Sequence, residues 1–303
     1  MKFTLVALCL ILTFASQAQM LNDSPFDTRV ALPKYPQGKG PKVLFDKGHF
    51  NFIVEMGLAK PLMDLATADG YQVVVDSMKF TKAYLAPYKM LVIFPAMPFK
   101  FGSKKQVTDE ITFTPDELNA LHDWVSNGGS LLMFDEHAPI DKSVTPLFNK
   151  FGIQLSIGIV SDSLNYETKF TIPNKETLLK FTRSNGLLNT DHPITQGEKT
   201  GEQINNIMGY SGGGLTGAGY TNIFKLSPSA TIKKYSGSAP SGTANSQGLA
   251  GKFGKGKIVA LGDCNGFTAM YVMIKSVKFS AGMQVTDYDW KQFALNTLHW
   301  LSI

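Results

Sequence analysis

Continuous apolar runs alternate with amphipathic segments in the first half of the chain. Apolar runs without polar alternation are typical of strands that are buried on both faces of a sheet. Four short runs of this kind cover residues 43–45, 71–75, 90–94 and 130–134. Residues 52–68 instead carry apolar residues at helical spacing, with Pro61 expected to bend or restart the helix. Strands that alternate with helices in this way predict a doubly wound α/β domain with a mainly parallel sheet.

The clearest local signal is a helix start at residues 114–117, which read Thr-Pro-Asp-Glu. Thr114 is expected to cap the helix, Pro115 to occupy its first position, and Glu117 to reach back to the amide of the cap. Asn127 and the two glycines that follow it are expected to end this helix. A second capped helix is expected to close the chain after Asp287.

The pattern changes between residues 152 and 251. Short segments that resemble strands are separated there by stretches rich in Gly, Ser and Asn, and they cover residues 169–172, 222–226 and 230–235. The parallel pattern resumes with the run at 257–261. We therefore expect an extended lead-in at 19–41 and then a single α/β domain over 42–303, with a β-rich excursion at about 152–251.

The N-terminal residues have the pattern of a secretory signal peptide. Lys2 precedes an apolar run at 3–14, and Ser16-Gln17-Ala18 supplies a small-x-small cleavage site. We expect residues 1–18 to be removed and the protein to be exported to the periplasm or the extracellular space. The apolar run is shorter than the roughly 20 residues of a spanning helix, so no stable membrane span is expected after cleavage.

Composition narrows the classes of function. A chain of 303 residues that is 44% hydrophobic can bury a full core. Its formal charge of +5 comes almost entirely from lysine, because Arg29 and Arg183 are the only arginines. Arginine is favoured for bidentate recognition of phosphates and bases, so nucleic acid is not expected as a partner. Cys264 is the only cysteine beyond residue 18, which excludes an internal disulfide in the exported chain.

Polar residues follow three of the predicted parallel strands. Ligands bind beyond the carboxyl ends of the strands in open parallel sheets, so we expect these residues to meet at one edge. They are Asp46, His49 and Asn51 after the first strand, Asp135, Glu136 and His137 after the fourth, and Asp263 and Asn265 after the strand at 257–261.

The residue types in these three groups suit two kinds of chemistry. A carboxylate beside an imidazole suits a general base near neutral pH, and two histidines with a carboxylate suit a divalent metal. We expect His49, Asp135 and His137 to carry a metal-assisted or acid–base hydrolysis of a small polar ligand, such as a carbohydrate or a cell-wall fragment. Supporting or ligand-binding roles are expected for Asp46, Asn51, Glu136, Asp263 and Asn265. Taken singly, each residue also fits a plain capping or packing role.

Two other functions stay open. Residues 209–213 match the G-x-S-x-G pattern of a nucleophile elbow, which would make Ser211 a serine hydrolase nucleophile. The glycine-rich residues that follow do not predict the helix that such an elbow needs. The other alternative is a non-catalytic envelope scaffold or transport accessory, in which the loop at 210–220 and the β-rich region contact an envelope protein partner.

Several motifs resemble those of uncharacterised secreted bacterial proteins whose domain is similar to class I glutamine amidotransferases in fold. The resemblance covers roughly residues 42–303 and implies a flavodoxin-like sheet. Relatives of similar architecture include trehalose-utilisation-like proteins and components of gliding-motility transport. The motifs are KVLFDKGHFNF, DGYQVVV, NGGSLLMFDEHAP, FGI, DHPITQG, FGKGKIVALGD and GFTA.

The chain differs from the amidotransferases at the positions of their catalytic residues. Their catalytic cysteine occupies a strand-to-helix elbow, and the matching segment here, residues 134–138, contains no cysteine. Asp263, Cys264 and Asn265 stand where a His-x-Glu partner would follow the strand at 257–261. Glutamine hydrolysis by the family mechanism is therefore not expected.

Overall fold

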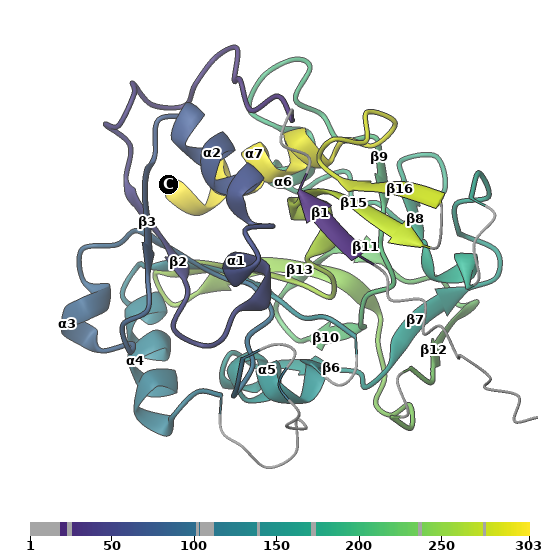
Figure 1. Ribbon diagram of the computed structural model, residues 1–303, viewed down its shortest axis with the longest axis horizontal. Coiled ribbons are helices and arrows are strands. Elements are labelled where there is room, and N and C mark those ends of the chain that lie inside the picture. The colour runs from purple at the N-terminus through teal and green to yellow at the C-terminus, as the bar shows by residue number, and fades with distance from the viewer. Residues whose placement is uncertain are drawn as a thin grey trace, which may run out of the picture.

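The largest sheet of the protein has nine strands in the order β3-β2-β4-β5-β14-β13-β10-β6, with β11 paired to β13 (Figure 1). The computed structural model describes residues 19–22, 26–100, 103, 112–137, 140–170, 174–235, 238–274 and 277–303. In this part of the chain no helix is long and apolar enough to cross a membrane.

Five neighbouring strands of this sheet are parallel to one another. They are β3 (Gln72–Asp76), β2 (Lys42–Asp46), β4 (Met90–Ile93), β5 (Ser130–Phe134) and β14 (Gly256–Leu261). Counted along the chain, their order is 2-1-3-4-5, which is the order of flavodoxin-like doubly wound sheets. The predicted α/β class is confirmed, and each predicted parallel strand is correct to within one residue at either end.

Helices cover both faces of the sheet, which explains the continuous apolar runs of its strands. Val43 and Phe45 lie in one buried core with α1, α2 and α7, whereas Leu44 lies in the opposite core with α4 and α5 (Figure 1). The helices are α1 (Phe52–Glu55), α2 (Lys60–Ala68), α3 (Lys82–Leu85), α4 (Pro115–Ser126), α5 (Ile140–Lys150), α6 (Pro193–Gln196) and α7 (Trp290–Ser302), with the 3-10 turns η1 (Lys175–Thr177) and η2 (Asn265–Phe267).

Three of the four predictions about helix ends are confirmed. Pro61 lies in the first turn of α2, so the helix restarts there. Thr114 and Glu117 form the predicted capping box of α4, and Asn127 is its C-cap. The predicted cap of the closing helix is wrong. Asp289 occupies that position, while the carboxylate of Asp287 forms an exposed ion pair with Lys169 at 2.8 Å.

The β-rich excursion extends the parallel sheet with antiparallel strands. β13 (Ser246–Phe253) pairs with β14, and the sheet continues through β10 (Leu215–Gly217) and β6 (Ile153–Leu155), with β11 (Thr221–Lys225) also paired to β13. Shorter pairs join β7 (Ile159–Asp162) to β12 (Ala230–Lys233) and β8 (Lys180–Thr182) to β9 (Asn206–Met208).

The predicted lead-in begins with a strand, because β1 (Gln19–Asn22) pairs with β15 (Ala269–Ile274), which in turn pairs with β16 (Val277–Gly282). One other sequence prediction needs correction. Residues 169 and 170 of the strand predicted at 169–172 are not in a strand, and 171–172 lie outside the described residues.

Candidate functional site

The predicted site residues lie at the carboxyl edge of the parallel strands but fall into separate groups. β5 and β14 are neighbours, so the residues that follow them lie side by side. β4 lies between β2 and β5, which separates the residues that follow β2 from the others. Strand order therefore decides which of the predicted residues meet.

The first group is built around His49 in the loop after β2. Its Nδ1 lies 3.0 Å from both carboxylate oxygens of Asp46, and its Nε2 lies 3.2 Å from Oε1 of Glu117 on α4. The rings of Phe80 and Phe113 are centred 4.7 and 4.5 Å from the imidazole, which is consequently only 6% exposed. His49 thus joins the end of β2 to the start of α4.

The electrostatics of this group favour the imidazolium form of His49. Burial lowers the pKa of His49, but hydrogen bonds and charge from Asp46 and Glu117 outweigh burial and raise it above 6.5. Burial likewise raises the pKa of Glu117, but hydrogen bonds from Thr114 and the charge of His49 bring it below 4.5. His49 and Glu117 therefore form a buried ion pair through Nε2 of the histidine. The other ring nitrogen, Nδ1, bonds to Asp46.

The crevice between β2 and β4 is crossed by hydrogen bonds of the protein itself. The side-chain amide of Asn51 donates to the carbonyl of Phe94 at 3.0 Å, and the amide of Met97 donates to the carbonyl of His49 at 2.9 Å. This crevice is the topological switch point of the sheet, where flavodoxin-like proteins bind their ligands. Here its two loops are bonded to each other.

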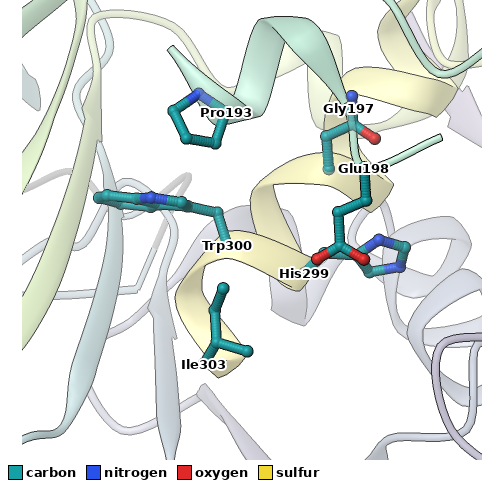
Figure 2. A pocket seen from close by; sticks show the side chains of 7 residues that line it. Pro193, Gly197, Glu198, His299, Trp300 and Ile303 are labelled. Carbon is teal, nitrogen blue, oxygen red and sulfur yellow. The ribbon is translucent and has the colours of Figure 1, made fainter.

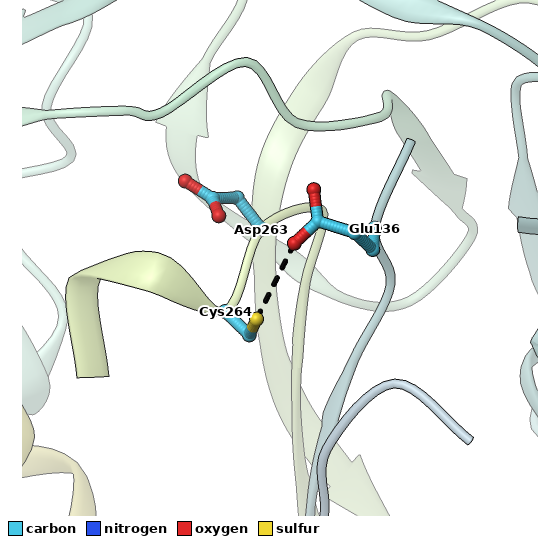
Figure 3. Close-up of side chains that lie close together, drawn as sticks. All are labelled: Glu136, Asp263 and Cys264. Carbon is cyan, nitrogen blue, oxygen red and sulfur yellow. Dashed lines mark hydrogen bonds between the residues drawn. The ribbon is translucent and has the colours of Figure 1, made fainter. Parts of the chain in front are cut away.

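The second group consists of Glu136, Asp263 and Cys264, at the ends of β5 and β14 (Figure 3). All three are buried, and one ligand atom of each lies within 4.8 Å of the others. The thiol of Cys264 donates to Oε2 of Glu136 at 3.3 Å. Asp263 accepts hydrogen bonds from the amides of Tyr210 and Asn265 and from the side chain of Asn265, at 2.7 to 2.8 Å.

Burial dominates the acid–base properties of this second group. It raises the pKa of Glu136 to about 7, and together with the charge of Glu136 it raises that of Asp263 to about 7. Among the described residues, no lysine or arginine forms an ion pair with either carboxyl group; Glu136 is 3.5 Å from Nε2 of His137. Burial and the two carboxyl groups also raise the pKa of the Cys264 thiol well above 9, which makes Cys264 a poor nucleophile.

Within the part of the chain that the structure describes, the same three residues form the group that could hold a divalent cation. Two carboxylates and a thiolate are a suitable donor set for zinc. A cation would have to displace the thiol proton of Cys264 and any proton on the two carboxyl groups. The predicted ligands His49 and Asp135 are not part of this donor set.

Asp135 is buried without a hydrogen bond from any described residue to its carboxyl group. Its side chain is fully buried, and within the described chain neither carboxyl oxygen has a hydrogen-bond partner. Burial, followed by the charge of Asp141, raises the pKa of Asp135 well above 3.8. Successive side chains of an extended segment point to opposite sides, so Asp135 and Glu136 face apart. Because neither carboxyl oxygen of Asp135 bonds to His137, the predicted carboxylate–imidazole pair does not form.

His137 is a more accessible neighbour of the second group. Its side chain is 28% exposed, and its ring is centred 4.0 Å from that of Tyr235. It contacts Glu136, whereas His49 bonds to Asp46 and Glu117, so the two predicted histidines have different carboxylate partners. The contact of Glu117 with His49 was not predicted, because the capping pattern at the start of α4 already explains a glutamate at this position. Nothing in the sequence indicates the contact of Tyr235 with His137.

Ser211 has one feature of a nucleophile elbow but lacks its surroundings. Its φ of +65° is the left-handed conformation that a residue with a side chain rarely adopts. Its hydroxyl lies 2.6 Å from the hydroxyl of Thr177, and the chain continues into β10 and not into a helix. The predicted absence of a helix is confirmed, and the nucleophile–histidine geometry of a serine hydrolase does not follow from these contacts.

A further buried histidine lies near the C-terminus, on α7. Nε2 of His299 is 2.7 Å from Oδ2 of Asp69, while its Nδ1 is buried without a partner among the described residues. Figure 2 shows His299 beside Glu198 and Trp300 in a cavity of about 30 Å³. This cavity has room for a water molecule but not for an organic ligand.

Comparison with known proteins supports the fold. No protein-family model and no curated protein matches the chain. Among solved structures, the N-terminal domain of mmIFT52 is similar with a TM-score of 0.54 and 14% identity, covering 86% of this chain and 96% of that domain. At this identity the similarity concerns the fold alone.

Two bacterial structures are more distant. A protein from Parabacteroides merdae described as ThuA-like has a TM-score of 0.44 and 12% identity, covering 87% of this chain and 90% of its own. A cytoplasmic protein from Salmonella typhimurium LT2 has a TM-score of 0.44 and 14% identity, covering 86% of this chain and 100% of its own. The residues at the carboxyl edge must therefore carry any argument about function.

Proposed function

We propose that the protein binds and hydrolyses a small polar ligand at the carboxyl edge between β5 and β14. The observation that supports this most is the pair Glu136 and Asp263, two buried carboxyl groups on adjacent strand ends whose pKa values are both raised to about 7. Perturbed carboxyl groups without a compensating lysine or arginine are costly in a purely structural role and common at active sites.

The chemistry follows from the raised pKa values of the pair. Near pH 7 one carboxyl group is protonated and the other ionised, so the pair titrates as a unit. The ionised member accepts a proton from an attacking water, and the protonated member donates its proton to the oxygen of the leaving group. His137, partly exposed and next to Glu136, exchanges protons between the pair and solvent.

A hydrolase assay tests this proposal. The full chain would be incubated with three p-nitrophenyl substrates, with and without EDTA. They are p-nitrophenyl acetate, p-nitrophenyl β-glucoside and p-nitrophenyl β-N-acetylglucosaminide. We expect turnover with a bell-shaped pH profile near pH 7, and at least about a 100-fold lower kcat in Glu136→Gln. Loss of turnover in EDTA would indicate that a cation takes the place of the proton on the pair. Absence of turnover with every probe, or full turnover in Glu136→Gln, would rule out the proposed hydrolysis.

A non-catalytic interaction module is the second candidate, and the closed crevice at the switch point favours it. Beside this crevice, Phe50 has φ +42° and is 40% exposed, and Met78 in the adjoining loop is 57% exposed. The loop at 210–220 that was expected to contact a partner is less suitable, because Gly212, Gly213 and Gly214 are buried. An envelope protein partner would bind near Phe50, and the hydrolase assay above separates this function from the first.

Export is proposed on the N-terminal pattern alone. Lys2, the apolar run at 3–14 and the small residues before Gln19 support a cleaved signal peptide. Expression of the full chain in a Gram-negative host should yield a periplasmic or extracellular protein whose N-terminal residue is Gln19. Recovery of a cytoplasmic protein that retains residues 1–18 would contradict export.

A further inference from the structure

We propose that a second ligand site, for a neutral saccharide, lies at the opposite, amino-terminal edge of the parallel sheet. A cavity of about 450 Å³ opens there between α3, the C-terminal turn of α4 and the segments that lead into β4 and β5. Tyr88 lies just before β4, and Gly128 and Gly129 lie just before β5. The cavity is therefore separated from Glu136 and Asp263 by the length of the strands, and its role does not depend on the proposed hydrolysis.

The size of this cavity suits a small organic ligand. Binding sites for such ligands usually measure about 300 to 1,000 Å³. The cavity near His299 measures about 30 Å³, and a cavity beside Asp263 and Trp290 measures about 10 Å³. These two are large enough only for water, whereas the cavity at the amino-terminal edge is large enough for one or two sugar rings.

Aromatic rings supply the apolar surface of the cavity. The indole of Trp124 packs directly on Gly129, where a Cβ atom would lie 2.3 Å from the ring. Glycine at this position thus lets Trp124 lie against the turn and line the cavity. Tyr88 lines it as well, and its ring is centred 5.6 Å from that of Tyr84. Both lining aromatics are only half-buried, so each presents ring surface to a ligand.

The polar groups of the cavity suit hydroxyl groups. Lys82, Asp123 and Asn127 line it with exposed side chains that supply an ammonium donor, a carboxylate acceptor and an amide. The amide of Asn127 donates to the carbonyl of Asp123 at 2.8 Å, which orients it at the end of α4. A hydroxyl group both donates and accepts, so neighbouring hydroxyls on one ring can bond to all three side chains.

Charge and shape together favour a saccharide over a nucleotide. The cavity has one cationic and one anionic side chain, so a phosphate would gain the attraction of Lys82 but meet the repulsion of Asp123. A sugar ring has apolar C–H faces for Trp124 and Tyr88 and hydroxyls at its edge for the polar side chains. This combination of aromatic walls and few oriented polar groups is typical of small-molecule sites.

Saturation-transfer NMR on the full chain tests the proposal, with glucose, N-acetylglucosamine, cellobiose, chitobiose and adenosine 5′-monophosphate as probes. We expect signals from the ring C–H protons of at least one sugar and none from the nucleotide. Affinity for that sugar should fall at least tenfold in Trp124→Ala and Asn127→Ala. Because Asn127 is exposed, its variant should remain folded even where Trp124→Ala loses packing.

Two controls make the result specific. Trp300→Phe changes a tryptophan on α7 that packs on Lys257 and does not line the cavity, so this variant should bind the sugar as wild type does. Glu55→Gln, at an exposed glutamate of α1 outside both proposed sites, should also bind it normally. Absence of signal from every sugar, signal from the nucleotide alone, or sugar binding unchanged in both Trp124→Ala and Asn127→Ala would overturn the proposal.

Discussion

Replacing His49 with alanine is expected to lower the free energy of unfolding by about 3 to 5 kcal/mol near pH 6. The imidazolium of His49 bonds to Asp46 through Nδ1 and to Glu117 through Nε2. Asp46 is 1% exposed and Glu117 is 4% exposed. Removing the cation would leave two buried carboxylates facing each other across an empty space between Phe80 and Phe113.

Urea unfolding followed by circular dichroism measures this effect, with His122→Ala as the matched control. His122 lies on α4 and also pairs with an aspartate, Asp123 at 3.2 Å, but its side chain is 38% exposed. Exposed pairs contribute between about 0 and 1 kcal/mol, so the control should unfold almost as wild type does. A loss at His49 as small as that of the control would show that the buried ion pair does not stabilise the fold.

The stabilising effect of His49 should depend on pH in a defined direction. Its pKa is raised in the folded protein above the ordinary value of 6.5. The folded state therefore binds the proton more tightly than the unfolded state. The contribution is fully present below pH 6.5 and is lost as the pH rises through the folded pKa. The stability difference between wild type and His49→Ala should accordingly shrink in alkaline solution.

The parallel half of the fold could be predicted because its signals are local. Each strand is an unbroken apolar run, as burial on both faces requires, and Thr114 with Glu117 marks the start of α4 within four residues. The cap of α7 was mispredicted because Asp287 and Asp289 stand two residues apart and both precede the helix. The backbone amides of Asn205 and Asn206 bond to Asp289, which only the tertiary structure reveals.

The sequence predicted where the candidate site lies, but not which of its residues are in contact. The carboxyl ends of the strands could be identified from the runs that precede Asp135 and Asp263. The contact of His49 with Glu117 spans 68 residues and depends on how α4 packs against the end of β2. The opposite directions of Asp135 and Glu136 depend on the conformation of the segment after β5, and the separation of His49 from His137 depends on strand order.

Replacing Glu136 with glutamine is expected to stabilise the fold at pH 8 by about 1 to 3 kcal/mol, while it removes the proposed catalytic group. Burial raises the pKa of Glu136 from 4.5 to about 7. Each unit of pKa corresponds to about 1.4 kcal/mol of difference between the two protonation states. Ionised Glu136 is therefore costly in the folded protein, and a neutral amide of the same shape, which still accepts a bond from Cys264, avoids that cost.

The pH dependence distinguishes this cause from a change in packing. Between pH 4.5 and about 7 the folded state binds more protons at Glu136 than the unfolded state, so its contribution to stability is present below pH 4.5 and declines as the pH rises through the folded value. Wild type and Glu136→Gln should unfold alike at pH 4 and differ increasingly up to pH 8. Glu55→Gln, at an exposed glutamate on α1, should show no such trend.

The opposite result would be equally informative about the site. If Glu136→Gln were less stable than wild type at pH 8, the ionised carboxylate would have to be neutralised by a cation in the folded protein. A protonated His137, whose Nε2 lies 3.5 Å from Oε1 of Glu136, would be one such cation. A destabilisation that vanishes in EDTA would instead identify a bound metal ion at Glu136, Asp263 and Cys264. If the carboxyl group of Glu136 destabilises the fold at neutral pH, packing alone would favour an amide at this position. The presence of a glutamate is then best explained by a ligand that it binds or a proton that it transfers.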